Sequence, residues 1–299
     1  APHQARDSAE AKFPTAVRFL DSAVANGAAP GAVLAVSWHG RRWYHGTGRL
    51  GIDDATVPDS LTLYDLASVT KVTALTPLAL FAASQGALDL DAPIQRYVPE
   101  FVGAGKDGVT VRQLLTHSSG LPAWRPLYME TATRRGALAL ADSTPLDALP
   151  GARMVYSDLG IIVMTQALER IDGHRLDTLA HDLVFGPLGM HSTRYLPPAA
   201  WLPRIAPTEH DTIWRHRMLR GEVHDENASR LDGVSGHAGL FSDGIDMLTY
   251  GEWWVAEWNA WSGHGPAGSE APEYPAMRLS ALPDFVVRQD TPPGSSRAL

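Results

Sequence analysis

The spacing of apolar residues predicts a helix followed by a β-hairpin at the start of the chain. Residues 11–27 carry apolar side chains at helical intervals, and Gly27 ends the pattern. Residues 31–51 contain an apolar run, a turn at His39-Gly40 and a returning segment. This order of run, turn and run is typical of two antiparallel strands.

Helical spacing dominates the rest of the chain, in segments that Pro and Gly interrupt. Residues 68–85 form a long pattern closed by Gly86, and Pro77 inside it should kink the helix or leave one carbonyl unpaired. Further helices are predicted at 109–116 with Thr110 as the cap, at 158–172 and at 179–190. The Gly-, Pro- and Ser-rich residues 260–275 predict an exposed loop.

Strand signals are concentrated near the N-terminus and become scarce afterwards. A single hairpin is only marginally stable and needs further strands. Weak strands near residues 275–290 would complete the sheet. The alternative is a chain that stops before its sheet is complete, and the sequence leaves both open.

Composition limits the classes of protein to consider. A length of 299 residues suits one large domain or two closely packed ones, and 44% hydrophobic with 19% charged residues is an ordinary globular composition. The formal net charge of −8, without a basic run, argues against a nucleic-acid partner. No apolar run approaches the roughly 18–20 residues of a membrane span. The oligomeric state is not indicated.

The chain contains no cysteine, which excludes disulfides, thiolate catalysis and cysteine-based zinc sites. It begins with Ala1 rather than Met, so we expect that an export signal or a tag has been removed. Only three of the 25 basic residues are lysines: Lys12, Lys71 and Lys106. A lysine retained in such a chain is a candidate for a role that needs a removable proton, which arginine cannot supply.

Ser68 and Lys71 form a Ser-x-x-Lys motif at the start of the predicted helix 68–85. Residues three apart share one helical face, so the hydroxyl and the amine can meet. The free N–H groups at a helix N-terminus would stabilise an oxyanion, and an electropositive site favours a neutral amine that takes a proton from serine. The alternative is an ordinary surface Ser and Lys, but the flanking residues are apolar.

Two further segments combine polar residues with a helix end. Tyr156 could move a proton between nucleophile and leaving group, and Asp158 could hold the lysine or bind a substrate amide. The structural alternative is that Ser157 or Asp158 only caps the helix that follows. His117, beside two serines, suggests a triad, but a helix stop whose side chains bond to the local backbone is the favoured interpretation.

The segments SVTK at 68–71, LLTHSSGLP at 114–122 and YSDLG at 156–160 occur in this order. Together they resemble the beta-lactamase-related serine hydrolases, which include class C beta-lactamases, D-Ala-D-Ala carboxypeptidases and family VIII esterases. The resemblance implies that Ser68 is the acylated nucleophile and Lys71 its base. Tyr156 would be the second proton carrier, and Asp158 would stand where many relatives have Asn.

The resemblance also implies the fold and its division. The expected fold class is α/β (α+β), with an antiparallel sheet flanked by helices and an inserted, mostly helical domain. Residues 1–118 would form the first part of the α/β domain, 119–230 the helical domain, and 231–299 the return to the α/β domain. His224-Asp225-Glu226-Asn227, followed by GHAGLFS at 236–242, is similar to a sub-branch linked to cell-wall enzymes.

The family carries a third motif, Lys-Thr-Gly or His-Thr-Gly, on a late strand that supplies an oxyanion N–H. His237-Ala238-Gly239 matches it only superficially, because its surroundings resemble a segment that leads into a helix. We therefore expect the motif after residue 299, so that the chain is a partial family member. Loss of one oxyanion donor costs a factor of about 10²–10³ in rate, so activity is a separate question from ancestry.

Short-chain ester hydrolysis is the first function expected. D-Ala-D-Ala carboxypeptidase or weak beta-lactamase activity is the alternative, and an inactive relative with a binding role is a third hypothesis. The expected partner is a small-molecule ester, a beta-lactam or a cell-wall peptide, with Trp124, Trp201 and Trp214 either lining an acyl pocket or simply packing. The resemblance implies a periplasmic or secreted location, and the cytoplasm stays open.

Two other hydrolase classes find less support. An α/β-hydrolase needs a G-x-S-x-G elbow, and residues 233–237 fail at the fifth position. A metallohydrolase would need ligand spacing such as H-E-x-x-H, which does not occur. The nearest clusters of metal-binding residue types are His210-Asp211 with His216, and His224-Asp225-Glu226. No metal and no cofactor are expected.

Overall fold

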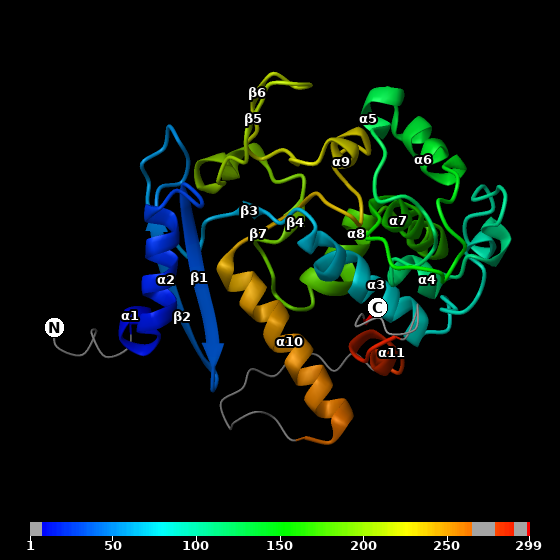
Figure 1. Ribbon diagram of the computed structural model, residues 1–299. Helices are drawn as coiled ribbons and strands as arrows, with labels where there is room; N and C mark the ends of the chain where they lie inside the picture. The colour runs from blue at the N-terminus through cyan, green and yellow to red at the C-terminus, as the bar shows by residue number, and fades with distance from the viewer. Residues whose placement is uncertain (1–7, 265–278, 290–297) are drawn as a thin grey trace. The chain divides into compact units, whose positions relative to one another are not determined.

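The computed structural model describes residues 8–264, 279–289 and 298–299 (Figure 1). The chain folds into two compact units, each assembled from three separated segments. The first unit comprises Ala1–Asp65, Pro187–Glu222 and Phe241–Ala276, and the second comprises Leu66–Gly186, Val223–Leu240 and Met277–Leu299. The predicted domain boundaries near residues 118 and 230 stay a prediction, because these units are defined by packing alone.

The hairpin predicted near the N-terminus is confirmed. Strand β1 (Gly31–Trp38) pairs antiparallel with β2 (Arg41–Gly48). The two residues between them, His39 and Gly40, have φ values of 51° and 73°. A two-residue turn with both φ angles positive follows the natural twist of the flanking strands, so the hairpin forms from local signals.

Helices pack on both faces of this hairpin within the first unit. The predicted N-terminal helix forms as α1 (Ala9–Lys12) and α2 (Pro14–Ala25), and these helices contact β1 and β2. Leu34 packs against their apolar cluster of Ala9, Val17 and Trp43. Helix α10 (Gly244–Ser262) contacts the other face of β1, beside Ala35. Alternate residues of β1 therefore point to different helices.

The remaining strands are short, as the scarcity of strand signals predicts. The largest set orders β3 (Tyr64–Asp65), β7 (Leu240–Ser242) and β4 (Arg194–Tyr195) as β3-β7-β4. A separate pair joins β5 (His210–Asp211) to β6 (Arg217–Met218). The chain passes from β7 directly into α10.

The predicted helix 68–85 forms in two parts within the second unit. Residues Lys71–Leu75 make a π-helical turn, η2, and Thr76–Ser84 continue as α3. The Thr76 N–H donates to the Lys71 carbonyl, five residues back. Pro77 lies in the first turn of α3, where its missing N–H is tolerated. The structure shows a change from π-helical to α-helical geometry just before Pro77, where a kink or an unpaired carbonyl was expected.

Two capped helices form where the sequence predicts them. Thr110 and Gln113 make a capping box at the start of α4 (Val111–Leu115). Ser157 caps α7 (Asp158–Asp172), and Gly173 ends it in the left-handed conformation. Residues Leu159–Leu168 of α7 are all buried, which makes it the central helix of this unit.

Shorter helices complete the second unit. They are η3 (Ile94–Arg96), η4 (Lys106–Gly108), α5 (Leu127–Glu130), α6 (Arg134–Ser143), α8 (Leu176–Ala180), the π-helical turn η5 (His181–Phe185) and α9 (Glu226–Arg230). The helix predicted at 179–190 forms only in its first part, because α8 and η5 end at Phe185 and residues 186–190 are not helical. The first unit adds one 3₁₀ helix, η6 (Ala199–Arg204).

The prediction of strands near residues 275–290 is wrong for the part of that segment that the structure describes. Residues Leu282–Val286 form a helix, α11, that starts with Pro283 in its first turn. Leu282 and Phe285 are buried, and α11 contacts α3. A short apolar run does not distinguish strand from helix, and here burial of one helical face decides. Residues 275–278 and 290 lie outside the described residues, as does the 265–275 part of the expected loop.

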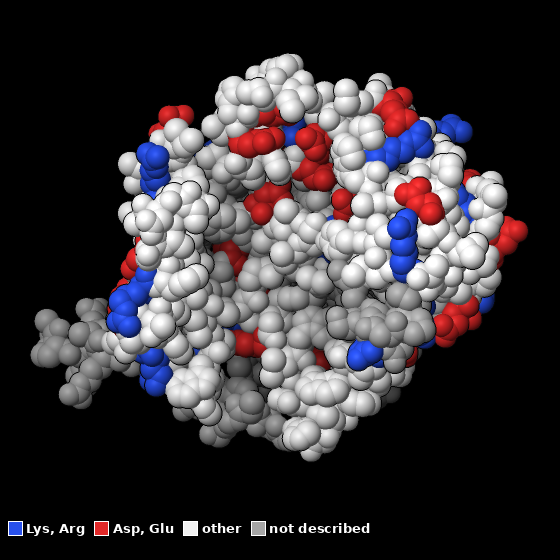
Figure 2. Space-filling view, viewed as in Figure 1, with Lys and Arg blue, Asp and Glu red and all other residues white. Residues whose placement is uncertain are grey.

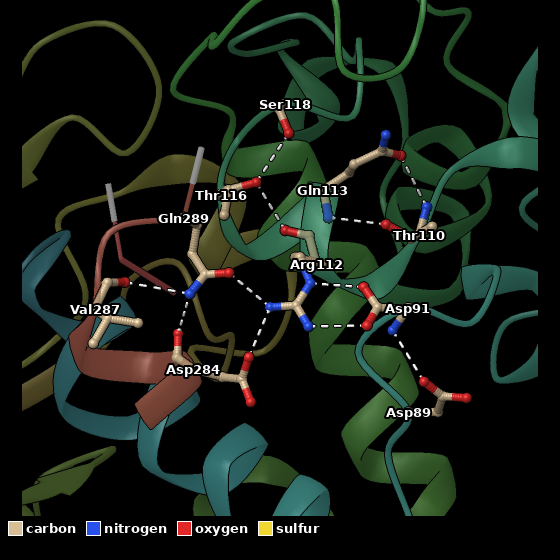
Figure 3. A network of polar contacts seen from close by, with 10 residues as sticks. All are labelled: Asp89, Asp91, Thr110, Arg112, Gln113, Thr116, Ser118, Asp284, Val287 and Gln289. Atoms are coloured by element: carbon tan, nitrogen blue, oxygen red, sulfur yellow. Dashed lines mark hydrogen bonds and ion pairs between the residues drawn. The ribbon is translucent and has the colours of Figure 1, made fainter. Parts of the chain in front are cut away.

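Arg112 fastens α11 to the second unit, as Figure 3 shows. Its guanidinium binds Asp91 through two hydrogen bonds of 2.7 and 3.0 Å. The same group donates to Asp284 at 3.1 Å and to Gln289 at 2.7 Å. The fork of an arginine suits such paired contacts, so one side chain links α4, the Asp91 turn and the end of α11.

The surface carries charge of both signs. On the face shown in Figure 2, basic side chains are scattered or lie beside acidic ones, and they form no continuous basic area. Among the described residues, no helix combines the length and the apolar character that crossing a bilayer requires.

Asp142 is a buried carboxyl whose ionisation should cost stability. Its side chain accepts a hydrogen bond of 2.7 Å from Gln166, and the residue is 4% exposed. Burial raises the pKa of Asp142 from 3.8 to about 6, and the charge of Glu100 adds to this effect. The hydrogen bond from Gln166 and the charges of Arg170 and Lys106 lower the pKa but do not offset the loss of solvation. The folded state therefore holds this proton more tightly than the unfolded chain does.

Asp142→Asn should stabilise the protein above pH 6 and change little near pH 4. Between these pH values the wild-type protein loses stability as Asp142 ionises, whereas an amide does not titrate. We expect a gain of about 1–3 kcal/mol in the free energy of unfolding at pH 7.5. Urea unfolding of both proteins at pH 4.5 and 7.5 measures it, and an equal difference at both pH values would contradict the assignment.

Candidate active site

The five candidate residues meet at the amine of Lys71, within the second unit. They are Ser68, Lys71, Tyr156, Asp158 and His237. Lys71 is 5% exposed, and its Nζ donates to Ser68 Oγ at 2.8 Å and to the carbonyl of His237 at 3.1 Å. Asp158 Oδ1 lies 2.7 Å from the same nitrogen, and the Tyr156 ring centroid lies at 4.7 Å. Sequence segments up to 166 residues apart therefore converge on one atom.

Ser68 lies at an exposed, tightly turned helix start. Ala67 before it has a φ of 44°, which is uncommon for a residue with a side chain. Leu66 donates to the carbonyl of Leu240 at 2.8 Å, and Leu240 donates in turn to Thr70 Oγ1 at 3.2 Å. These bonds hold both ends of the turn against the 240 segment. A strained residue kept by its surroundings is a feature found at functional sites.

Asp158 is positioned by the start of α7. Ser157 Oγ accepts from the Gly160 N–H at 3.2 Å and so caps the helix, as the structural alternative predicted. Asp158 itself donates its N–H to the Ala123 carbonyl at 2.9 Å, and its carboxylate faces Lys71. The contact lacks the geometry of a hydrogen bond and acts as a close ion pair. An anionic side chain in the first helical turn is also favoured by the helix dipole.

Tyr156 is 40% exposed, and its ring lies close to both Lys71 and His117. The Tyr156 and His117 ring centroids are 4.5 Å apart. His117 Nδ1 accepts from the Ser157 N–H at 3.0 Å, and the His117 carbonyl accepts from Val155 at 2.8 Å. His117 thus holds the backbone around Tyr156, in line with the structural interpretation and not with a triad.

His237 reaches Lys71 through its backbone and not through its ring. The ring is buried, with Nδ1 at 2.7 Å from Ser235 Oγ and Nε2 at 2.9 Å from Asp225 Oδ1. The segment that follows leads through β7 into α10, as its surroundings in the sequence indicate. The expectation that the third family motif follows residue 299 stays a prediction.

Asp225 is a member of this cluster that the sequence did not single out for catalysis. Burial alone would raise its pKa. The charge and hydrogen bond of His237, the Ala228 N–H and the charge of Lys71 together lower the pKa of Asp225 to about 2. The sequence offered Asp225 as part of a possible metal cluster and of a segment that resembles one sub-branch of the family. Its spacing of twelve residues from His237 follows no regular element, so no pattern could pair them.

The two clusters of metal-binding residue types have other contacts. Asp211 accepts from the N–H groups of Ile213, Trp214 and Arg215. Asp225 is occupied by His237 and by the cap of α9. Within the part of the chain that the structure describes, no three His, Asp or Glu residues are placed to hold a metal ion.

The protein-family model described as Beta-lactamase matches residues 16–290 of the chain. The chain belongs to the beta-lactamase family. The family resemblance inferred from the three segments is confirmed.

Two curated relatives of this beta-lactamase-family chain carry names from cell-wall chemistry. An N-acetylmuramyl-L-alanine amidase of Bacillus subtilis is 34% identical over 214 residues, which cover 62% of this chain and 48% of that protein. A protein of Salmonella agona, provisionally named D-alanyl-D-alanine carboxypeptidase, is 31% identical over 242 residues, which cover 72% and 55%. The chain spans about half the length of these relatives.

Solved structures of the family share the fold. A class C beta-lactamase of Rhodobacter sphaeroides superimposes with a TM-score of 0.70 at 23% identity, over 91% of this chain and 70% of that one. A beta-lactamase/D-alanine carboxypeptidase of Pseudomonas syringae gives 0.71 at 20% identity, over 92% and 71%. The predicted fold class is confirmed, and the α/β-hydrolase alternative is wrong.

Gly236 brings the His237 carbonyl close to both helices of the site. Its N–H donates to Thr165 Oγ1 of α7 at 2.9 Å. A Cβ at this position would lie 2.2 Å from Leu75 Cδ1 and 2.7 Å from Thr165 Oγ1. Only a residue without a side chain lets the segment approach Leu75 and Thr165 together.

Gly236→Ala should therefore destabilise the protein by about 1–3 kcal/mol, as overpacking in a filled core does. Gly251→Ala in α10 is the matched control, because a Cβ there meets nothing within 4 Å. The control should be neutral or stabilising by up to about 1 kcal/mol, since alanine favours a helix over glycine. Urea unfolding compares the two. Equal stability of Gly236→Ala and wild type would show that the segment is not closely held.

Proposed function

We propose that the chain is a serine acyl hydrolase that works through an acyl-enzyme at Ser68. The observation that carries this proposal is the 2.8 Å hydrogen bond between the exposed Ser68 hydroxyl and a buried lysine amine. A hydroxyl becomes a nucleophile when a positioned group can take its proton. Membership of a family of serine hydrolases supports the same conclusion.

In the proposed reaction Ser68 Oγ attacks the carbonyl carbon of an ester or amide. The serine proton passes to the Lys71 amine, a proton is delivered to the leaving oxygen or nitrogen, and the bond to the leaving group breaks. Water then attacks the acyl carbon, one proton of that water passes to Ser68 Oγ as the acyl–oxygen bond breaks, and the carboxylic acid leaves. The exposed Tyr156, whose ring lies beside Lys71, is the proposed carrier of the proton to the leaving group.

Asp158 gives this chain a proton route of its own. An amine must be neutral to accept the proton of Ser68, so Lys71 needs a neighbour that can take a proton from it. Asp158 Oδ1 is 2.7 Å from Nζ and is the proposed first recipient. An Asn, which many relatives have here, could not accept a proton.

The substrate we propose is a carboxylic amide or ester of cell-wall type. The names of the two curated relatives, an amidase and a carboxypeptidase, support amide substrates. Short-chain ester hydrolysis, expected first from the sequence, stays a prediction and serves as the simpler assay. Trp124 is 46% exposed and follows Ala123, whose carbonyl binds the Asp158 N–H, so Trp124 is the proposed apolar contact for the acyl group.

The nucleophile assignment is tested by covalent labelling. We expect one fluorophosphonate adduct per chain, formed as an oxygen–phosphorus bond at Ser68 with loss of fluoride. Intact-mass spectrometry measures the adduct. Ser68→Ala should abolish it with the fold intact by circular dichroism, whereas Ser143→Ala, at an exposed serine of α6, should label normally.

An adduct that survives in Ser68→Ala would overturn the assignment of the nucleophile. A wild-type chain that takes no adduct would favour the third hypothesis, a catalytically inactive relative with a binding role.

Lys71→Arg should reduce the labelling rate by at least about 10²-fold, because an arginine does not release its proton to act as a base. Lys12→Arg is the matched control, since Lys12 is exposed and lies 4.3 Å from the Trp38 ring, a contact that arginine also makes. The rate of adduct formation measures both variants. A near wild-type rate in Lys71→Arg would mean that Lys71 has a structural role only.

A further inference from the structure

The buried residues Ser235, His237 and Asp225, which lie next to Lys71, have no role in the proposed reaction so far. His237 offers its backbone carbonyl to Lys71, while its buried ring is held on both sides by Ser235 and Asp225. The His237 residue is 1% exposed, so its ring cannot contact a substrate directly. Anything that it contributes to the reaction acts through Lys71.

Asp225 is itself rigidly placed. Its Oδ1 accepts from the Ala228 N–H at 2.7 Å and caps α9. Helix α9 is anchored in turn by Asn227, whose side chain accepts from the Tyr128 N–H at 3.1 Å and donates to the Arg125 carbonyl at 2.8 Å. The carboxylate that binds the ring therefore rests on a fixed frame, not on a mobile loop.

The segment between Ser235 and His237 is equally constrained. The Gly236 N–H binds Thr165 of α7, and the residue packs against Leu75 of the helical turn that carries Lys71. Backbone, ring and cap thus fix the direction in which the His237 carbonyl points.

We infer that Asp225 and His237 form a buried positioning pair for the proposed acylation step: together they fix the carbonyl that holds Lys71 toward Ser68, and the Asp225 carboxylate attracts the amine. The inference rests on the proposed function. Neither residue is a catalytic residue, because neither side chain reaches the substrate. Ser235 completes the pair by fixing the second ring nitrogen.

The pair has a predicted electrostatic consequence. The groups that the described contacts place around Lys71 Nζ are Tyr156, Asp158 and, behind His237, Asp225. The charge of Lys71 contributes to lowering the pKa of Asp225, and such coupling is reciprocal. The Asp225 carboxylate therefore attracts the Lys71 amine, and Asp225→Asn removes that attraction.

Three variants test the pair with fluorophosphonate labelling and with p-nitrophenyl acetate hydrolysis across pH. In Asp225→Asn the maximal acylation rate should fall about 10- to 100-fold, the cost of a misplaced catalytic group, with KM within about threefold. The limb of the rate–pH profile that reports proton loss should move to lower pH, because the attraction between the Asp225 carboxylate and the amine is lost. His237→Asn should lose a similar factor in rate.

Asp225→Glu separates charge from shape. This variant retains the carboxylate, so the proton-loss limb of its rate–pH profile should stay at the wild-type pH even if the maximal rate falls. Asp232→Asn is the matched control: it removes one exposed carboxylate just after α9, at a φ of 61° that Asn tolerates. It should keep the wild-type rate and profile.

The outcomes are separable. If the labelling rates of Asp225→Asn and His237→Asn are within twofold of that of Asp232→Asn, the positioning role of the pair is overturned and the proposed function is left intact. A rate loss without a shift of the limb would also overturn it, because a purely structural role predicts that result. A wild-type chain that takes no label would overturn both proposals. Should His237→Asn fail to fold by circular dichroism, Asp225→Asn and Ser235→Ala decide the question.

Discussion

A lysine amine withdrawn from water must be surrounded by acceptors, and this requirement organises the second unit. Burial of an unpaired ammonium costs far more than a folded protein can spare. Lys71 Nζ meets Ser68 Oγ, the His237 carbonyl and Asp158, which come from the turn before η2, the segment before β7 and the start of α7. Each acceptor fixes one element, so the site and the packing of the unit are the same set of contacts.

Local signals predicted the elements that carry this site. The Ser157 cap, the run 158–172 and Gly173 define α7 without help from the rest of the chain. The same holds for the Thr110 capping box of α4 and for the turn at His39-Gly40. Because a helix start fixes the direction of its first side chains, the sequence could offer Asp158 as a partner of the lysine, with a substrate amide or a helix cap as the alternatives.

Contacts between distant segments were beyond the reach of these signals. His237 was chosen for its side chain, yet its backbone carbonyl is what meets Lys71. Asp225 joins it because a buried imidazole needs partners for both nitrogens, a demand that arises only after the chain has folded. The prediction of a strand over Leu282–Val286 was wrong for a related reason. Five mostly apolar residues fit a strand or a helix equally well, and contact with α3 decides in favour of the helix.

The two buried lysines show what distinguishes a candidate catalytic amine from a structural one. Lys106 resembles Lys71 in construction: it is 1% exposed, donates to a backbone carbonyl, that of Asp142, and lies 4.4 Å from the ring of Phe101. The carboxyl of Asp142, however, binds Gln166, and burial raises its pKa to about 6, whereas Asp158 lies directly on the Lys71 amine. Only Lys71 has an exposed hydroxyl as a neighbour. Burial creates the demand for acceptors at both sites, and chemistry becomes possible where one of those acceptors is a nucleophile that a substrate can reach.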